Sequence, residues 1–123
     1  MKNLLFSLGF ILIASTSVFP QSTSCAELLN YVESNGRSKG SVSSLSLYDS
    51  SWLSGVKAYT IEGNLAVVAT ITKNEYDIYG KKYVFCGIPS SNWDAFYYGT
   101  YDYGLSYGER FHKYIMDYVC DCY

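Results

Sequence analysis

The spacing of apolar residues near the start of the chain predicts an amphipathic helix between Ser24 and Gly36. Apolar positions recur at i, i+3, i+4 and i+7, namely Cys25, Leu28, Leu29 and Val32. Ser24 and Glu27 have the spacing of a capping box, in which each side chain satisfies the other residue's backbone N–H. Asn35-Gly36 then predicts the end of the helix, with Gly36 in the left-handed conformation.

The middle of the chain changes to an extended pattern. Val56–Ile61 and Leu65–Thr72 are rich in β-branched and aromatic residues, and Glu62-Gly63-Asn64 between them predicts a hairpin turn. Both alternating sets of Leu65–Thr72 are largely apolar, which predicts a central strand, and residues 83–86 form the next strand. Residues 37–46 are polar and rich in serine and glycine, so we interpret them as a loop with room for a short strand. We interpret residues 73–80 as a polar connection that carries tyrosines.

Two further helices follow. Pro89 in a first turn, with Ser91 capping onto Asp94, predicts a helix that ends at Gly99. Its apolar face consists of Trp93, Phe96 and Tyr97. A second capping box, Ser106 with Glu109, starts the last helix. The core stripe of that helix is Tyr107, Phe111, Tyr114, Ile115 and Tyr118.

These elements predict an α+β fold: a small antiparallel β-meander of three to four strands, with an N-terminal helix and two C-terminal helices packed on one face of it. Residues 25–123 are enough for a single domain with one small core. Trp93 and Phe111 lie on the apolar stripes of their helices, so we expect both to be core residues and not ligand contacts.

The first 24 residues have the pattern of a secretory signal peptide followed by a short stub. One charge, Lys2, precedes an eleven-residue apolar run over residues 4–14, which is too short to span a bilayer. Small polar residues follow, and we expect the mature protein to begin between residues 18 and 25. The predicted location is secreted or periplasmic. A lipoprotein anchored at Cys25 is disfavoured, because Ser22-Thr23-Ser24 lacks the aliphatic residue expected three places upstream.

Charge narrows the classes of partner. The chain has nine Lys and Arg against eleven Asp and Glu, and a mildly acidic protein argues against nucleic acid as the ligand. No second hydrophobic span is present in the sequence. His112 is the single histidine and lies about two helical turns before Cys120 and Cys122, so we expect no metal site and no cofactor.

The four cysteines, Cys25, Cys86, Cys120 and Cys122, predict two disulfides in a short exported chain. A bridge between Cys120 and Cys122 would close a strained ring, so each is expected to pair elsewhere. Two pairings stay open: Cys25–Cys120 with Cys86–Cys122, or Cys25–Cys122 with Cys86–Cys120. Either assigns Cys86 to a crosslink with the C-terminal tail and not to a nucleophile.

An unusual concentration of tyrosine marks residues 97–107, in which five of the eleven positions are tyrosine. Tyrosine provides large contact area at a low cost in side-chain entropy, which is typical of recognition loops. The candidate contacts are Trp52, Tyr97, Tyr98, Tyr101, Tyr103, Tyr107 and the polar side of the last helix, Glu109, Arg110, His112 and Lys113. A loop that only packs over a small core is the alternative interpretation.

An ordered set of short motifs resembles the KTSC domain family, which is named from its occurrence at the C-terminus of some lysyl-tRNA synthetases. The set begins with Ser50-Ser51-Trp52-Leu53, continues through the corner Tyr83-Val84-Phe85-Cys86-Gly87-Ile88-Pro89 with Trp93 and Phe96, and ends with Ser106-x-Gly108, Phe111, Ile115 and Tyr118. It extends from about residue 49 to residue 118. The resemblance implies a fold more than a function and supplies no catalytic residues.

The function we expect is that of a small, secreted, non-enzymatic binding module, stabilised by disulfides. Its partner would be an extracellular or envelope protein or glycan. The alternative is a small secreted hydrolase or processing enzyme that uses Ser50 or Ser51 with His112. A hydrogen-bonded group of Ser51, His112 and Glu109 would favour the enzyme, and a solvent-exposed tyrosine cluster would favour recognition.

Overall fold

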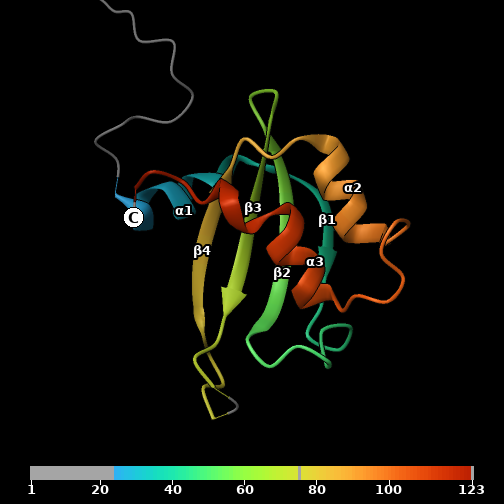
Figure 1. The fold of residues 1–123 in the computed structure, drawn as a ribbon. Helices are drawn as coiled ribbons and strands as arrows, with labels where there is room; N and C mark the ends of the chain where they lie inside the picture. The colour runs from blue at the N-terminus through green and yellow to red at the C-terminus, as the bar shows by residue number, and fades with distance from the viewer. Residues whose placement is uncertain (1–23, 75, 123) are drawn as a thin grey trace, which may run out of the picture.

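The structure is a computed structural model that describes residues 24–74 and 76–122. The predicted signal segment, residues 1–23, lies outside the described residues. The elements, in chain order, are α1 (Cys25–Asn35), β1 (Arg37–Val42), β2 (Leu53–Ile61), β3 (Asn64–Ile71), β4 (Lys81–Cys86), α2 (Ser90–Tyr98), α3 (Tyr107–Tyr114) and a short 3₁₀ helix, η1 (Met116–Tyr118). The α+β class and the helices at both ends of the meander are confirmed (Figure 1).

The sheet is a four-stranded antiparallel meander in the order β1-β2-β3-β4. β3 lies between β2 and β4, as its apolar pattern predicted. β2 and β3 are joined by the two residues Glu62 and Gly63, whose φ angles are 50° and 81°. Positive φ at both positions matches the right-handed twist of the flanking strands and makes a tight hairpin.

The helices cover both faces of the sheet, and the prediction that all three share one face is wrong (Figure 1). α1 packs Leu28 and Val32 against one face, together with Tyr59, Ile61, Ala66, Val68 and Val84. α2, α3 and the residue after α3 bury Trp93, Phe96, Phe111 and Ile115 against the other face, together with Val56, Ala58, Val67, Ala69 and Phe85. Successive strand residues point to opposite faces, so a strand that is apolar on both sides needs a cover on both sides.

Trp93 and Phe111 are core residues, as expected, with 2% and 0% of their surface exposed. The ring of Phe111 packs edge-on against Phe85 and Phe96, with centroids 5.2 Å and 5.8 Å away. The core on this face therefore depends on interlocked aromatic rings from β4, α2 and α3.

Both predicted capping boxes are present. Ser24 and Glu27 cap α1, and Ser106 and Glu109 cap α3, with each serine hydroxyl accepting from the glutamate N–H at 3.2 Å. The end of α2 also agrees with prediction, because Gly99 adopts the left-handed conformation with φ 65°.

Two predicted helix boundaries are wrong in detail. Gly36 does not adopt the left-handed conformation: its φ of −75° and ψ of 151° lead directly into β1. α2 begins at Ser90 with Pro89 as its N-cap, and no side chain caps it, so Ser91 does not play that role. Residues 37–42 form an edge strand with a register shift between Ser38 and Gly40, where only room for a short strand was expected.

The two disulfides are Cys25–Cys122 and Cys86–Cys120, so the structure selects the second of the open pairings. No helix continues through the tail. Val119 is extended and forms a bridge with Phe85 of β4, and the Cys120 N–H donates to the Val84 carbonyl at 3.1 Å. The chain turns at residues 121 and 122, directly after Cys120, so the Cys120 and Cys122 thiols reach different elements.

No helix within the described residues has the length and apolar character required to cross a membrane.

Candidate functional site

The connection between α2 and α3 presents the most exposed tyrosines of the α2–α3 side of the molecule. We call residues 98–106 the tyrosine loop. Tyr98, Tyr101 and Tyr103 are 70%, 82% and 90% exposed. They are exposed aromatic side chains of the kind that the recognition interpretation requires.

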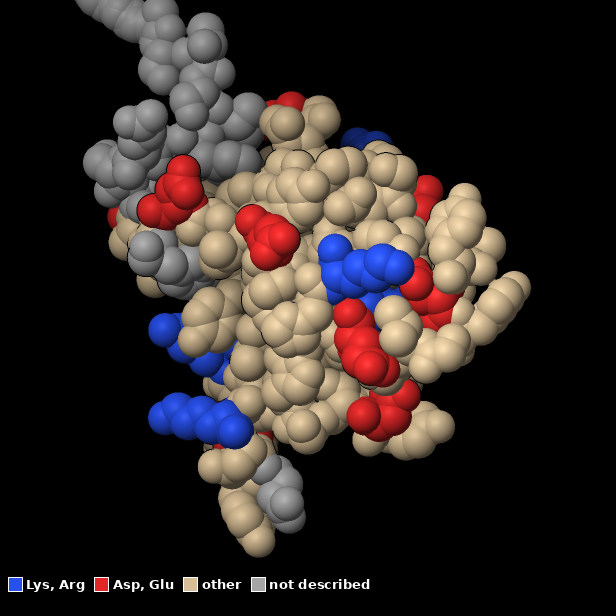
Figure 2. Space-filling view, in the orientation of Figure 1, with Lys and Arg blue, Asp and Glu red and all other residues tan. Residues whose placement is uncertain are grey.

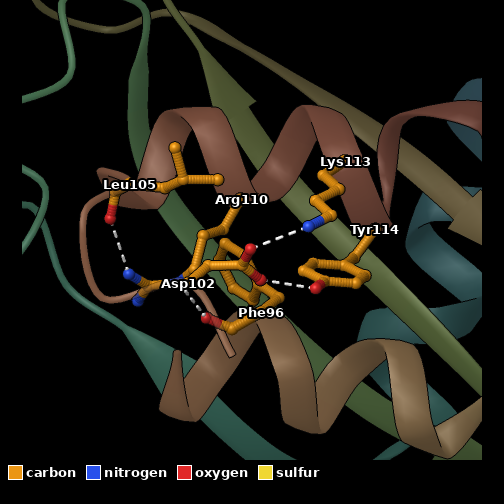
Figure 3. Close-up of polar contacts among 6 residues, drawn as sticks. All are labelled: Phe96, Asp102, Leu105, Arg110, Lys113 and Tyr114. Carbon is orange, nitrogen blue, oxygen red and sulfur yellow. Dashed lines mark hydrogen bonds and ion pairs between the residues drawn. The ribbon is translucent and has the colours of Figure 1, made fainter. Parts of the chain in front are cut away.

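Arg110 of α3 fixes the backbone of the tyrosine loop from beneath (Figure 3). Its guanidinium donates from Nε to the Phe96 carbonyl and from Nη1 to the Leu105 carbonyl, each at 2.9 Å. The guanidinium also lies 4.3 Å from the ring centroid of Tyr107. Arg110 is only 9% exposed, so these contacts satisfy a buried charge and connect α2, just before the loop, with the end of the loop through one side chain.

Asp102 provides a second anchor, in the middle of the tyrosine loop. Its carboxylate accepts from the Lys113 ammonium at 2.7 Å and from the Tyr114 hydroxyl at 2.5 Å, both on α3 (Figure 3). Only 8% of the Asp102 side chain is exposed. The hydrogen bonds from Lys113 and Tyr114 lower the pKa of Asp102, and the bond to Asp102 raises the pKa of both partners.

These anchors leave the tyrosine loop ordered before it meets any partner. Gly99 must lack a side chain, because an added Cβ would lie 2.8 Å from the Arg110 guanidinium carbon. A loop that is fixed in advance loses little conformational entropy on binding. The arrangement can therefore present exposed aromatic rings on a stable backbone.

Tyr97 and Tyr107, which flank this loop, have a different role. Tyr97 is half-buried and stacks on Trp93 at 5.4 Å, and Tyr107 is half-buried with its ring 5.6 Å from Phe96. Both belong to the packing of α2 against α3, which matches the alternative interpretation for this part of the segment.

Trp52, the residue before β2, lies beside His112 of α3. The Trp52 ring is half-buried, 5.8 Å from Phe111 and 4.9 Å from the ring of His112, which is itself exposed. Glu109 is exposed, but its carboxylate accepts from the Ser106 N–H at 2.9 Å as part of the helix cap. Of the predicted polar side of α3, Arg110 faces inward, and Lys113 pairs with Asp102.

The residues of the hydrolase alternative are not joined by hydrogen bonds within the described part of the chain. Ser51 is exposed, and its carbonyl accepts from the Thr72 hydroxyl at 3.4 Å. The Ser50 hydroxyl accepts from the Leu53 N–H at 3.1 Å, which is a local turn contact. Neither hydroxyl is hydrogen-bonded to His112.

No group of three or more His, Cys, Asp or Glu side chains in the described residues is arranged to hold a metal ion. The four cysteines are all in disulfides and offer no thiolate ligand.

The sequence did not lead us to predict the two anchors, Arg110 and Asp102, and only the role of Arg110 could have been inferred from it. Arg110 stands on the apolar stripe of α3, three residues after Tyr107 and four before Tyr114, so its inward direction could have been inferred from helical spacing. Asp102 is eleven residues from Lys113 and in no periodic element, and nothing in the sequence marks their pairing.

Comparisons of this chain with family models, with curated proteins and with solved structures found no match.

Proposed function

We propose that this protein is a small, secreted, non-enzymatic binding module, and that the tyrosine loop makes the principal contact. The partner we propose is an extracellular or envelope protein or a glycan. The observation that carries the proposal is a loop held by two anchors, Arg110 and Asp102, that nonetheless exposes Tyr98, Tyr101 and Tyr103 to solvent.

The energetic argument is one of preorganisation. Large aromatic side chains on a fixed backbone give contact area without the ordering cost that a flexible loop incurs on binding. A loop that served only to cover the core would bury its tyrosines, as Tyr97 and Tyr107 do. The three exposed tyrosines of the tyrosine loop contribute nothing comparable to the core.

The two disulfides indicate an oxidising setting, which agrees with an extracellular or periplasmic location. Secretion through the N-terminal segment is part of the proposal. Relationship to the KTSC family is also a proposal, supported by the order of the motifs between residues 49 and 118.

The test is capture of a partner with a photo-crosslinking amino acid placed at position 103 and, as a matched control, at position 48. Tyr48 is 87% exposed but belongs to the β1–β2 connection. The oxidised protein would be exposed to envelope fractions and culture medium of its host and to glycan arrays. We expect crosslinks from position 103 and not from position 48. Without the crosslinking amino acid, binding to envelope fractions or glycans should fall at least about tenfold in Tyr101→Ser/Tyr103→Ser.

Equal crosslinking at positions 48 and 103, or binding that is unchanged in the double variant, would contradict the assignment to the tyrosine loop. Empty arrays and empty captures at saturating protein would remove the support for a binding module.

A further inference from the structure

A second set of exposed apolar side chains gathers at one end of the sheet, away from the tyrosine loop. The β1–β2 and β3–β4 connections leave the same end of the meander (Figure 1). They carry five of the nine large apolar side chains that are exposed in the described residues: Leu45, Tyr48, Tyr76, Ile78 and Tyr79, each at least 80% exposed. The two connections at the opposite end, residues 62–63 and 87–89, carry none among them.

The densest part of this set is residues 76–79, which we call the β3–β4 tip. Tyr76, Ile78 and Tyr79 are 84%, 80% and 85% exposed. Asp77 between them points back into the connection, where its carboxylate accepts from the N–H groups of Lys73 and Gly80, both at 3.0 Å. The same carboxylate thus fixes the backbone while the three large side chains project outward.

Two backbone N–H groups of the tip itself, those of Tyr76 and Asp77, also have internal partners. The Asn74 side-chain oxygen accepts from the Tyr76 N–H at 2.9 Å, and the Asn74 carbonyl accepts from the Asp77 N–H at 3.1 Å. Backbone groups that already have partners do not depend on water, which lowers the cost of moving the tip into a less polar medium.

Lysines stand at the base of the β3–β4 tip. Lys73 precedes it, and Lys81 and Lys82 begin β4. Figure 2 shows basic side chains along the β4 edge above this connection, while acidic side chains gather over α3 and the tyrosine loop. Lys82 is paired with Glu33 at 2.9 Å, and the Lys81 ammonium lies 5.1 Å from the ring centroid of Tyr83. Three of the eight Lys and Arg residues in the described part of the chain therefore lie at the base of the tip, and one of them, Lys82, is paired with Glu33.

We propose that the β3–β4 tip enters the headgroup region of a lipid bilayer that contains anionic lipids, as a peripheral contact. Tyrosine and aliphatic side chains together suit the interface, where one part of a side chain is apolar and another stays hydrated. Lysines at the base would meet anionic headgroups. Leu45 and Tyr48 provide further apolar contact from the same end.

A bilayer fits this surface better than a protein partner does. The exposed side chains belong to two separate connections, β1–β2 and β3–β4. A fluid interface accepts separate projections, whereas a protein partner would need matching pockets for each. This contact uses a different surface from the tyrosine loop and goes beyond the proposed function.

The test places a tryptophan reporter at the tip. Ile78→Trp is compared with Tyr103→Trp, in the full oxidised chain, on vesicles of phosphatidylcholine and phosphatidylglycerol with and without brominated acyl chains. Trp52 and Trp93 are present in both variants, so their emission is a common background. The reporter responds to the depth of its own position, so binding of vesicles by the apolar run at residues 4–14 does not imitate the result.

We expect the added emission of Ile78→Trp to shift to the blue and to be quenched by brominated lipid, and that of Tyr103→Trp to do neither. Replacing phosphatidylglycerol with phosphatidylcholine should weaken insertion about fivefold for each lysine that meets the surface. Glu75 also precedes the tip in the sequence and carries negative charge. The comparison of the two lipids therefore measures whether the local charge favours anionic lipid. Equal quenching at positions 78 and 103, or none at position 78, would overturn the proposal, and insertion that ignores lipid charge would overturn its anionic part.

Discussion

At the scale of single residues, Gly36 shows a constraint that its backbone angles do not reveal. Its φ and ψ are available to any residue, but a Cβ added there would lie 2.6 Å from the Val32 carbonyl oxygen and 2.9 Å from the Tyr59 Cβ. The glycine is needed because the turn from α1 into β1 lies directly against the Tyr59 side chain of β2.

Gly36→Ala should therefore lower the free energy of unfolding by about 1–3 kcal/mol, measured by urea denaturation. The matched control is Gly104→Ala in the tyrosine loop, where an added Cβ meets nothing within 4 Å and stability should stay within about 0.5 kcal/mol. A Gly36→Ala protein as stable as the Gly104→Ala control would show that the turn relaxes freely.

Arg110 makes a second prediction at this scale. A lysine at this position keeps the charge but cannot donate to the Phe96 and Leu105 carbonyls together from a planar group. Arg110→Lys should cost about 1–3 kcal/mol in the free energy of unfolding, because a buried acceptor loses its donor. Arg37→Lys, on the exposed edge strand, is the control that should change little. Equal midpoints for the two variants would contradict the anchoring role.

At the scale of elements, the sequence predicted what depends on local chemistry. The capping boxes at Ser24 and Ser106 and the hairpin at Glu62-Gly63 follow from side chains within three or four residues of one another, and all are confirmed. The sequence left room for β1 but did not predict it, because most side chains of this edge strand are exposed and show no apolar alternation. Gly40 of β1 lies beside Trp93, whose ring would be in ordinary contact, at 3.4 Å, with an added Cβ.

The placement of the helices depended on contacts between distant segments. The apolar pattern of β3 on both of its sides did contain the information that both faces are covered, but it does not say which helix covers which face. That choice is made by packing and by the Cys25–Cys122 and Cys86–Cys120 pairing, which spacing alone left open. For the candidate site, the exposed tyrosines were predictable from composition, and the Asp102 anchor was not.

The Asp102 anchor makes the order of the tyrosine loop depend on pH. The folded-state pKa of Asp102 lies below the ordinary value of an aspartate, mainly because Lys113 and then Tyr114 donate hydrogen bonds to the carboxylate. The resulting stabilisation is complete above the unfolded-state pKa and is lost as the pH falls through the lower folded-state value. The pKa values of Lys113 and Tyr114 are raised by their hydrogen bonds to Asp102. The stabilisation from those bonds is therefore also lost at alkaline pH, as the two groups deprotonate.

Amide hydrogen exchange of residues 100–105 should accordingly rise below about pH 4, relative to intrinsic rates, and Asp102→Asn should show fast exchange at neutral pH already. Asp77, whose pKa is also lowered by backbone hydrogen bonds, titrates in the same range. Asp77→Asn is therefore the control: it should affect the β3–β4 connection and leave residues 100–105 protected. Protection of residues 100–105 that is the same in Asp102→Asn and in the unmodified protein would contradict the anchor.

At the scale of the whole molecule, the sheet separates two cores, and the C-terminal tail joins them. α3 and η1 belong to one face, but the chain then passes along β4 and ends bonded to α1 on the other face. The Cys86–Cys120 bridge fixes the tail to the edge strand, and the Cys25–Cys122 bridge fixes α1 to the tail. A domain of this size buries a limited core, so such crosslinks carry a large share of its net stability.

The two disulfides should differ in how much they stabilise the fold and in which segments they keep in place. They close loops with sequence separations of 97 and 34 residues, for which the chain-entropy model gives about 4.7 kcal/mol for Cys25–Cys122 and about 3.8 kcal/mol for Cys86–Cys120. Cys25→Ser/Cys122→Ser should lose the larger amount in urea denaturation, and its hydrogen exchange should rise first in α1, which has only a short apolar stripe to hold it. Cys86→Ser/Cys120→Ser should instead release the Val119–Phe85 bridge while the capping box of α1 stays in place. Non-reducing peptide mapping of the unmodified protein provides the check on connectivity. A peptide that joins Cys120 to Cys122, or a Cys86 thiol that alkylates in the native protein, would refute this arrangement and return Cys86 to the list of candidate nucleophiles.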